Sequence, residues 1–309
     1  MARADRPDNM QYLRPICTTL DAAVITNLEQ TRALEARAQV VRTPCGAGDM
    51  VWHVWGPADG KPVVMLHGGS GSWTHWVRNI DTVVGRGYRA IVADMPGFGD
   101  SAPPPTGSDA DALPPILEAG MRQVLGDQKM IGVGFSFGSL VNGLWLQHHP
   151  ERYAGVVFVG GPSLTDNAHV RPTLRSWYHE PPGPVRDAIL RENLLALMLA
   201  HETSLTEFAL RVHEANVLRD RLRKRRMSMK PWLFDLVPTI ACPVAGIYGS
   251  LDAAFPGRQL EKVETSLLRA PHFHSMTHVE NAGHWVQFED APAFNAALGH
   301  FLDTAHFTW

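Results

Sequence analysis

The feature that most constrains the fold is a series of short, uninterrupted apolar runs separated by helix-forming stretches. The runs are Pro62–Leu66, Tyr88–Ala93, Lys129–Val133, Ala154–Val159 and Val244–Tyr248. Helices are predicted between them, for example over Leu113–Leu125 and Ser139–His148. Strands that are apolar on both faces and alternate with helices are typical of a parallel sheet covered on both sides. We therefore predict an α/β fold with a mostly parallel sheet flanked by helices. Further strands are predicted at Met50–Trp55 and Met276–Glu280, and further helices at Asp21–Ala38 and Ala291–Phe301.

The alternation stops after Pro162, and residues 163–235 contain no convincing strand pattern. Two helices are expected there, Val185–Ala200 and Leu205–Arg226, the second with Ser204 and Glu207 as a capping box at its start. We predict a core built from residues 1–162 and 236–309, interrupted by an inserted helical cap over 163–235. Residues 1–10 are expected to be disordered.

Composition narrows the class of protein. The net charge is −3 and 19% of the residues are charged, which disfavours a nucleic-acid partner or a polybasic membrane anchor. No apolar run reaches 18 residues, and the N-terminus lacks the apolar centre of a secretory signal. The three cysteines, Cys17, Cys45 and Cys242, are far apart and odd in number. That pattern favours a reduced cytoplasmic protein over a disulfide scaffold or a cysteine metal site.

The sharpest motif is Gly134-Phe135-Ser136-Phe137-Gly138, which directly follows a predicted strand and directly precedes a predicted helix. A serine on such a tight strand-to-helix turn is exposed, and small residues beside it let the backbone turn sharply. The start of the helix supplies backbone N–H groups where negative charge would develop. We interpret Ser136 as a nucleophile; the alternative is a plain glycine turn.

A serine hydroxyl needs a base to accept its proton, and the base needs an acid to orient it. His284 lies on a loop after the last predicted strand, and Asp252 follows the strand before it. The chain order Ser136, Asp252, His284 matches one known arrangement of such triads. Asp94 and Asp235 are alternative acids, and Asp94 is disfavoured because it precedes the nucleophile.

The chain has 15 histidines, and His272, His274 and His278 form a cluster that could suggest a metal site. The cluster lies in and before a predicted strand, and no carboxylate pattern completes a zinc site. We therefore predict no metal and no cofactor.

A glycine-rich segment, His67-Gly68-Gly69-Ser70-Gly71, follows the strand that ends at Leu66. Glycines let backbone N–H groups approach a substrate oxygen, so Gly69 and Phe137 are the predicted oxyanion-hole donors. A flexible loop is the alternative; a phosphate loop would need a Lys-Ser/Thr ending, which is absent.

Aromatic residues near these motifs suggest an apolar or aromatic substrate pocket. The predicted substrate-binding residues are Phe135, Trp73, His75, Trp76 and Trp285. Aromatic residues at such positions are equally compatible with core packing.

Taken together, the His67-Gly68-Gly69 segment, Asp94-Met95-Pro96-Gly97-Phe98-Gly99, the serine turn, Asp252 and Gly283-His284 resemble the α/β-hydrolase superfamily. Within it, Leu66–Asn79 and Gly283–Glu289 are similar to the meta-cleavage-product hydrolases. The resemblance implies cleavage of a carbon–carbon bond in vinylogous 1,5-diketo acids from aromatic degradation. It also implies the same triad and a cap arginine that holds the substrate's acid group.

The chain departs from that family at two positions. Phe135 stands where the family usually has an asparagine, and His75 replaces a second pocket asparagine, so the pocket is more apolar. An arginine within Arg219–Arg226 could fill the cap role, although a solvated helix face explains that cluster as well. Dehalogenases and epoxide hydrolases share the layout but use an aspartate nucleophile, which Ser136 argues against.

These observations predict a serine hydrolase that cleaves a carboxylic ester or an acyl-activated C–C bond, through acyl-enzyme or gem-diol chemistry. Its partner is a small molecule, apolar or aromatic, with a carbonyl group; a homo-oligomer is left open. The alternatives are a lyase that uses the same triad, such as a hydroxynitrile lyase, and a non-catalytic ligand receptor. The lyase would need a cation near the site, for which Lys224 and Lys230 are the candidates.

Overall fold

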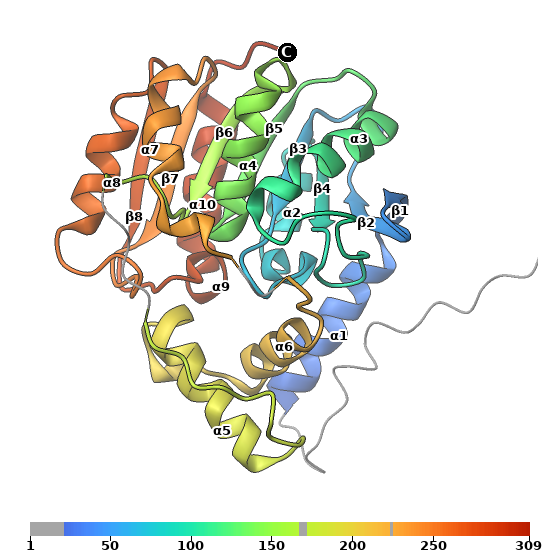
Figure 1. Cartoon of the computed structure of the whole chain (residues 1–309), viewed down its shortest axis with the longest axis vertical. Coiled ribbons are helices and arrows are strands. Elements are labelled where there is room, and N and C mark those ends of the chain that lie inside the picture. Colours follow the sequence, from blue (N-terminus) through green and yellow to red (C-terminus); the bar gives the residue numbers. More distant parts are fainter. Residues whose placement is uncertain (1–21, 167–171, 223–224) are drawn as a thin grey trace, which may run out of the picture.

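The structure is a computed structural model that describes residues 22–166, 172–222 and 225–309. Among these residues one eight-stranded sheet forms, in the order β1-β2-β4-β3-β5-β6-β7-β8 (Figure 1). The strands are β1 (Gln39–Cys45), β2 (Gly48–Trp55), β3 (Pro62–Leu66), β4 (Arg89–Asp94), β5 (Met130–Phe135), β6 (Tyr153–Val159), β7 (Val244–Gly249) and β8 (Phe273–Val279). Strand β2 runs antiparallel to both β1 and β4, and every other pairing is parallel.

The predicted α/β class and mostly parallel sheet are confirmed. The disorder expected over 1–10, and Cys17, fall outside the described residues.

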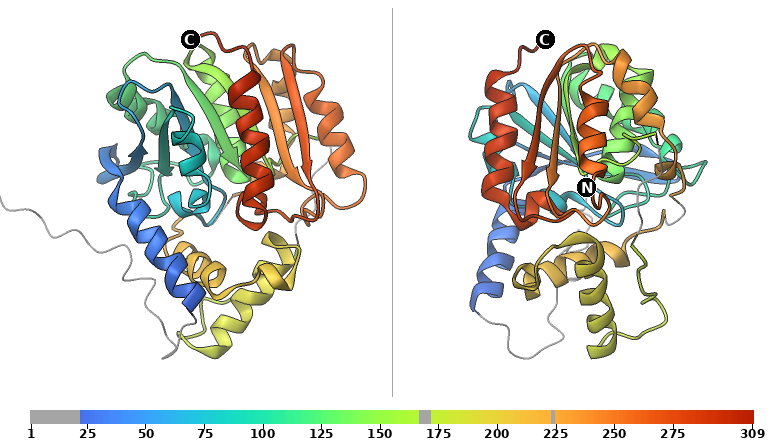
Figure 2. Two further views of the ribbon diagram at one scale, coloured as in Figure 1. Left: turned by 180° about the vertical axis from the view of Figure 1, so that it is seen from behind. Right: turned by 90° about the vertical axis from the view of Figure 1, so that its left-hand side faces the viewer.

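Helices cover both faces of the sheet (Figure 2). They are α1 (Ala22–Ala36), α2 (Ile80–Val84), α3 (Pro114–Leu125), α4 (Phe137–His148), α5 (Pro184–Asn193), α6 (Glu207–Leu218), α7 (Trp232–Leu236), α8 (Gln259–Leu267), α9 (Val286–Glu289) and α10 (Ala291–Thr304). Successive residues of a strand point to opposite faces, so the core divides into two apolar layers. In β3, Val63 and Met65 join the layer that contains Phe294 of α10. Val64 and Leu66 join the layer that contains Leu140 of α4.

Most predicted elements form within one to three residues of the predicted bounds, and β1, α2, α7, α8 and α9 were not among the predictions. Only Thr43 and Cys45 of β1 are buried, and the strand contains Pro44, so its sequence carries little apolar pattern. It is stabilised instead by its antiparallel pairing with β2 at the edge of the sheet.

Between β6 and β7 the described residues form helices and no strand. Helix α5 continues into a π-helical turn, η5 (Leu194–Met198), and α6 follows after the 3-10 turn η6 (Glu202–Ser204). Figures 1 and 2 show α5 and α6 standing off the end of the sheet, with α1 beside α6. We call the helical segment 163–235 the cap; its boundaries remain our prediction.

Two expectations about α6 were wrong. The helix ends at Leu218 rather than Arg226, and Thr206, not Ser204, caps its start by accepting a hydrogen bond from the Ala209 N–H. The Glu207 carboxylate does not accept the backbone N–H of Ser204 as a capping box requires, because it pairs with Arg191 and Arg211. Ion pairing within the cap thus replaces the predicted capping box.

No helix among the described residues is long and apolar enough to cross a membrane.

Candidate active site

Ser136 lies on the turn between β5 and α4, in a strained backbone conformation with φ of +50°. Its N–H donates to the Val159 carbonyl at 2.7 Å, which ties the turn to β6. A Cβ on Gly134 would lie 2.5 Å from the Gly138 carbonyl oxygen, and one on Gly138 would meet the Leu66 and His67 carbonyls. Glycine is therefore required at both positions, as the sharp turn predicted.

The side chain of His284 lies between Ser136 and Asp252. Its Nε2 is 2.8 Å from the Ser136 hydroxyl oxygen, and its Nδ1 is 2.8 Å from Asp252 Oδ2. Asp252 is 2% exposed and His284 is 4% exposed, so both groups are withdrawn from bulk water. The structure thus brings together three side chains that are 116 and 32 residues apart in sequence.

The loops after β7 and β8 hold each other in place. Leu251 N–H donates to the Ala282 carbonyl at 2.9 Å, and Asn281 N–H donates to the Ser250 hydroxyl at 2.9 Å. Asp252 Oδ1 accepts the Ala254 N–H at 2.9 Å, which leaves Oδ2 directed at His284. The orientation of the acid is therefore fixed by its own turn.

Two buried histidines support the loop that carries Gly69. His67 Nε2 accepts the Met95 N–H at 3.0 Å, so Nδ1 carries the proton and donates to the Gly68 carbonyl at 2.7 Å. His75 Nδ1 accepts the Gly68 N–H at 3.2 Å. Burial lowers the pKa of His67 to about 4 and holds the pKa of His75 well below its ordinary value. Both rings are therefore neutral near pH 7.

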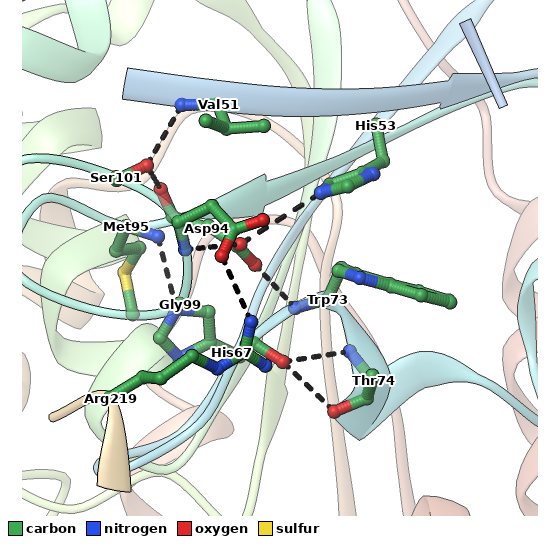
Figure 3. A network of polar contacts seen from close by, with 12 residues as sticks. Val51, His53, His67, Trp73, Thr74, Asp94, Met95, Gly99, Ser101 and Arg219 are labelled. Carbon is green, nitrogen blue, oxygen red and sulfur yellow. Dashed lines mark hydrogen bonds and ion pairs between the residues drawn. The ribbon is translucent and has the colours of Figure 1, made fainter. Parts of the chain in front are cut away.

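Asp94 organises the segment behind this loop (Figure 3). Its carboxylate accepts the Trp73 N–H at 2.8 Å and the Asp100 N–H at 2.9 Å, and its backbone carbonyl accepts the Ser101 hydroxyl. Burial alone would raise the pKa of Asp94, but the facing His53, Arg219 and the Asp100 N–H bring that pKa below its ordinary value. Asp94 therefore acts inside a structural network away from His284. The other alternative acid, Asp235, is exposed on α7.

A cavity of about 420 Å³ opens above Ser136. Its wall includes the predicted oxyanion residues Gly69 and Phe137, together with Phe135 and His284. Cap residues such as Leu197, Met198 and His213 close the opposite side.

The four other predicted substrate-binding residues do not belong to the wall of this cavity. Trp73 packs against His53 and Trp55, Trp76 against Phe135 and Phe294, and Trp285 stacks on Phe288. His75 lies beneath the glycine-rich loop, where a Cβ on Gly71 would meet its ring. Each of the four is at most 2% exposed, so these side chains pack in the core and do not line the cavity.

Among the arginines of Arg219–Arg226, the structure brings Arg225 into the cavity wall. A Cβ on Gly69 would lie 3.1 Å from Arg225 Nε, so the guanidinium covers the glycine-rich loop. Arg225 Nη1 lies 2.8 Å from Asp220 Oδ2, and Nη2 donates to the Ser70 hydroxyl at 3.1 Å. Arg219 pairs with Asp100, whereas Arg221 donates to the Gly99 and Ser101 carbonyls. Arg223 lies outside the described residues.

Neither the histidine cluster nor Lys230 of the cap belongs to the cavity wall. His274 contacts the hydroxyls of Ser275 and Thr304, and His278 lies 3.8 Å from Glu264. Within the described ranges no group of three or more histidine, cysteine or carboxylate side chains could hold a metal ion. Lys230 is exposed and lies over the Trp232 ring, and Lys224 is not described.

His213 was not among the predicted site residues, and no individual arginine was predicted to line the cavity. His213, Val217 and Asp220 all line the cavity, and their spacing of four and three residues places them on one side of α6 or its C-terminal extension. The signal that could have predicted these three residues is their position on one side of the helix.

The fold and this arrangement define an α/β hydrolase, and comparisons with known proteins agree. A family profile described as "alpha/beta hydrolase fold" matches residues 61–187. A 2-hydroxy-6-oxononadienedioate/2-hydroxy-6-oxononatrienedioate hydrolase of Klebsiella pneumoniae is 31% identical over 280 residues, which cover 82% of this chain and 91% of the relative. A 2-hydroxy-6-oxo-6-phenylhexa-2,4-dienoate hydrolase of Burkholderia cepacia is 27% identical, with 81% and 90% covered. The chain therefore belongs to the α/β-hydrolase superfamily, with relatives among the meta-cleavage-product hydrolases, and it is a hydrolase.

Solved structures support the fold. A carboxylesterase from Bacillus subtilis aligns with a TM-score of 0.69 at 18% identity, over 91% of this chain and 97% of that chain. An esterase from Rhodococcus sp. aligns with a TM-score of 0.67 at 21% identity, over 86% and 99%.

Proposed function

We propose that Ser136, His284 and Asp252 form a catalytic triad that hydrolyses a small carbonyl substrate. The observation that carries this proposal is the continuous pair of 2.8 Å contacts from the Ser136 hydroxyl through His284 to Asp252. In this proposal His284 Nε2 accepts the serine proton as Ser136 attacks the carbonyl carbon. Asp252 holds the imidazole in the required tautomer and stabilises the imidazolium that forms.

The developing oxyanion is held by the N–H groups of Gly69 and Phe137 in this mechanism. Phe137 is the first residue of α4, so its N–H is not used within the helix and the helix dipole favours negative charge there. Losing one such donor costs about 3 kcal/mol of transition-state stabilisation. Water activated by His284 then releases the acid.

We infer that the substrate carries an acid group, as in acyl-activated C–C cleavage. Two observations support this: Arg225 lies in the cavity wall with Ser136, and the Klebsiella relative is named for hydrolysis of a dicarboxylate, 2-hydroxy-6-oxononadienedioate. Asp220 offsets part of the Arg225 charge, which leaves hydrolysis of a neutral ester as the second candidate. In C–C cleavage, the proton that His284 accepted from Ser136 passes to the carbon leaving group as its bond to the carbonyl carbon breaks.

The test uses 2-hydroxy-6-oxo-6-phenylhexa-2,4-dienoate beside short p-nitrophenyl esters. Ser136→Ala is expected to lower kcat on every accepted substrate by at least about a thousandfold and to abolish labelling by a fluorophosphonate probe. Full turnover in this variant would refute the mechanism. Arg225→Gln is expected to weaken turnover of the dienoate about tenfold more than that of the esters; an equal effect on both would favour the ester reading.

The cytoplasmic location stays a prediction. Cys45 and Cys242 carry free thiols, which is consistent with a reducing compartment.

A further inference from the structure

His213 projects from α6 into the same cavity as Ser136 and His284. Neither ring nitrogen forms a hydrogen bond with another described residue, and Nδ1 is buried without a partner. A buried polar atom left in this state costs about 1–3 kcal/mol. A polar group lining a ligand cavity, yet not satisfied by the protein, is available to a substrate.

The orientation of α6 is set by polar contacts on the same side of the helix. Asn216, three residues beyond His213, accepts from the Ser72 hydroxyl at 2.7 Å and donates to the Thr74 hydroxyl at 3.1 Å. Further along this side, Arg219 pairs with Asp100 at 3.0 Å. Residues three and four apart share a helix face, so these anchors hold His213 towards the glycine-rich loop rather than towards solvent.

The charge state of His213 limits what it can bind. Burial lowers its pKa to about 4, so the ring is neutral near pH 7 and offers one donor and one acceptor nitrogen. A neutral imidazole suits a carbonyl or hydroxyl oxygen better than a carboxylate. The cavity therefore contains a cationic group, Arg225, and a neutral one, His213, on different parts of the cap.

We propose that His213 is a specificity-determining residue that hydrogen-bonds an uncharged oxygen, a ketone or hydroxyl, on the substrate chain. The proposal rests on the proposed function, because it concerns the substrate of the Ser136 site. It adds a second polar feature to the substrate, separate from the carbonyl that Ser136 attacks and from any acid group held by Arg225.

The test compares p-nitrophenyl hexanoate with its 4-oxo and 5-oxo derivatives, each rate being divided by the rate of alkaline hydrolysis of the same ester. The wild-type enzyme is expected to prefer at least one oxo ester by about fivefold in kcat/KM, the size of one ordinary hydrogen bond. His213→Phe is expected to reduce this preference to about one, and His213→Gln, which keeps both a donor and an acceptor, to retain most of it. His148→Phe, on the exposed end of α4, serves as the matched control.

No preference for either oxo ester in the wild-type enzyme would overturn the proposal, as would a preference that survives in His213→Phe. The wild-type comparison needs no variant, so the test stands even where a variant fails to fold, which thermal unfolding reveals. Failure of the triad proposal is separate: it would appear as hexanoate turnover that survives in Ser136→Ala, whatever the oxo preference.

Discussion

Asp94 and Asp252 both lie at the carboxyl ends of strands, but their carboxylates have different partners. Asp252 Oδ2 reaches His284, whereas both oxygens of Asp94 accept backbone N–H groups. Asp252 therefore has a role in the proposed reaction, whereas Asp94 holds the loops in place.

We expect Asp252→Asn to lower kcat by about ten-thousandfold, because the amide stabilises the wrong histidine tautomer, while the thermal midpoint changes little. Asp94→Asn should do the reverse: its amide would oppose a backbone N–H and cost about 2 kcal/mol of stability. Steady-state kinetics and thermal unfolding on both variants measure this. If Asp94→Asn lowers kcat more than Asp252→Asn does, Asp252 is not the acid of the triad.

At the scale of elements, α6 depends on an N-terminal capping residue that the sequence pattern did not identify. The Thr206 hydroxyl accepts the Ala209 N–H at 3.2 Å, and Ser204 belongs to the preceding 3-10 turn. Thr206→Ala is expected to lower the free energy of unfolding by about 1 kcal/mol. Ser204→Ala is the control and should have little effect; denaturant unfolding distinguishes them, and equal losses would contradict the assignment.

Glu289, at the end of α9, connects the cap to the loop that carries His284. Its carboxylate accepts the N–H groups of Ala200 at 3.0 Å, His201 at 3.1 Å and Gly283 at 2.7 Å. A Cβ on Gly283 would lie 2.7 Å from the Ala200 nitrogen, so the two segments approach closely. The element that positions the proposed base is therefore fastened directly to the cap.

Glu289→Gln puts an NH2 group where a backbone N–H must be accepted, so we expect kcat/KM to fall about tenfold and the thermal midpoint to drop. Glu280→Gln, on the exposed end of the same loop, is the matched control. Kinetics identical to the wild type in Glu289→Gln would show that the connection does not position His284.

At the scale of the whole molecule, buried neutral histidines make stability depend on pH. The pKa values of His67 and His213 fall from 6.5 to about 4 on burial, and that of His75 falls well below 6.5. Between about pH 6.5 and 4 the unfolded chain binds protons that the folded protein does not. The stabilisation is therefore complete above about pH 6.5 and is lost as the pH falls.

Each such histidine contributes a slope of about 1.4 kcal/mol per pH unit within that window. Denaturant unfolding at pH 7, 6 and 5 should show this decline in the free energy of unfolding. In His213→Gln the decline should be shallower, because unfolding then takes up about one proton fewer. A free energy of unfolding that stays constant from pH 7 to 5 would contradict the buried neutral state of these rings.

Local sequence was enough to predict the sheet, the serine turn and the order of the three triad candidates. The reason is that each depends on neighbours in the chain: apolar runs form the strands, and Gly134 and Gly138 permit the turn around Ser136. The burial of Trp73, Trp76 and Trp285 was not predictable in this way, because an aromatic residue looks the same in sequence whether it lines a cavity or fills a core.

Only the tertiary structure decided which cap groups face Ser136. Arg225 and His213 reach the cavity because Ser70 of the glycine-rich loop bonds Asp220 and Ser72 just after it bonds Asn216, which orients the cap over the sheet. Those contacts join residues about 140 to 155 positions apart, so no local pattern encodes them. Periodicity determines which elements form, whereas long-range polar contacts determine where the cap's side chains point.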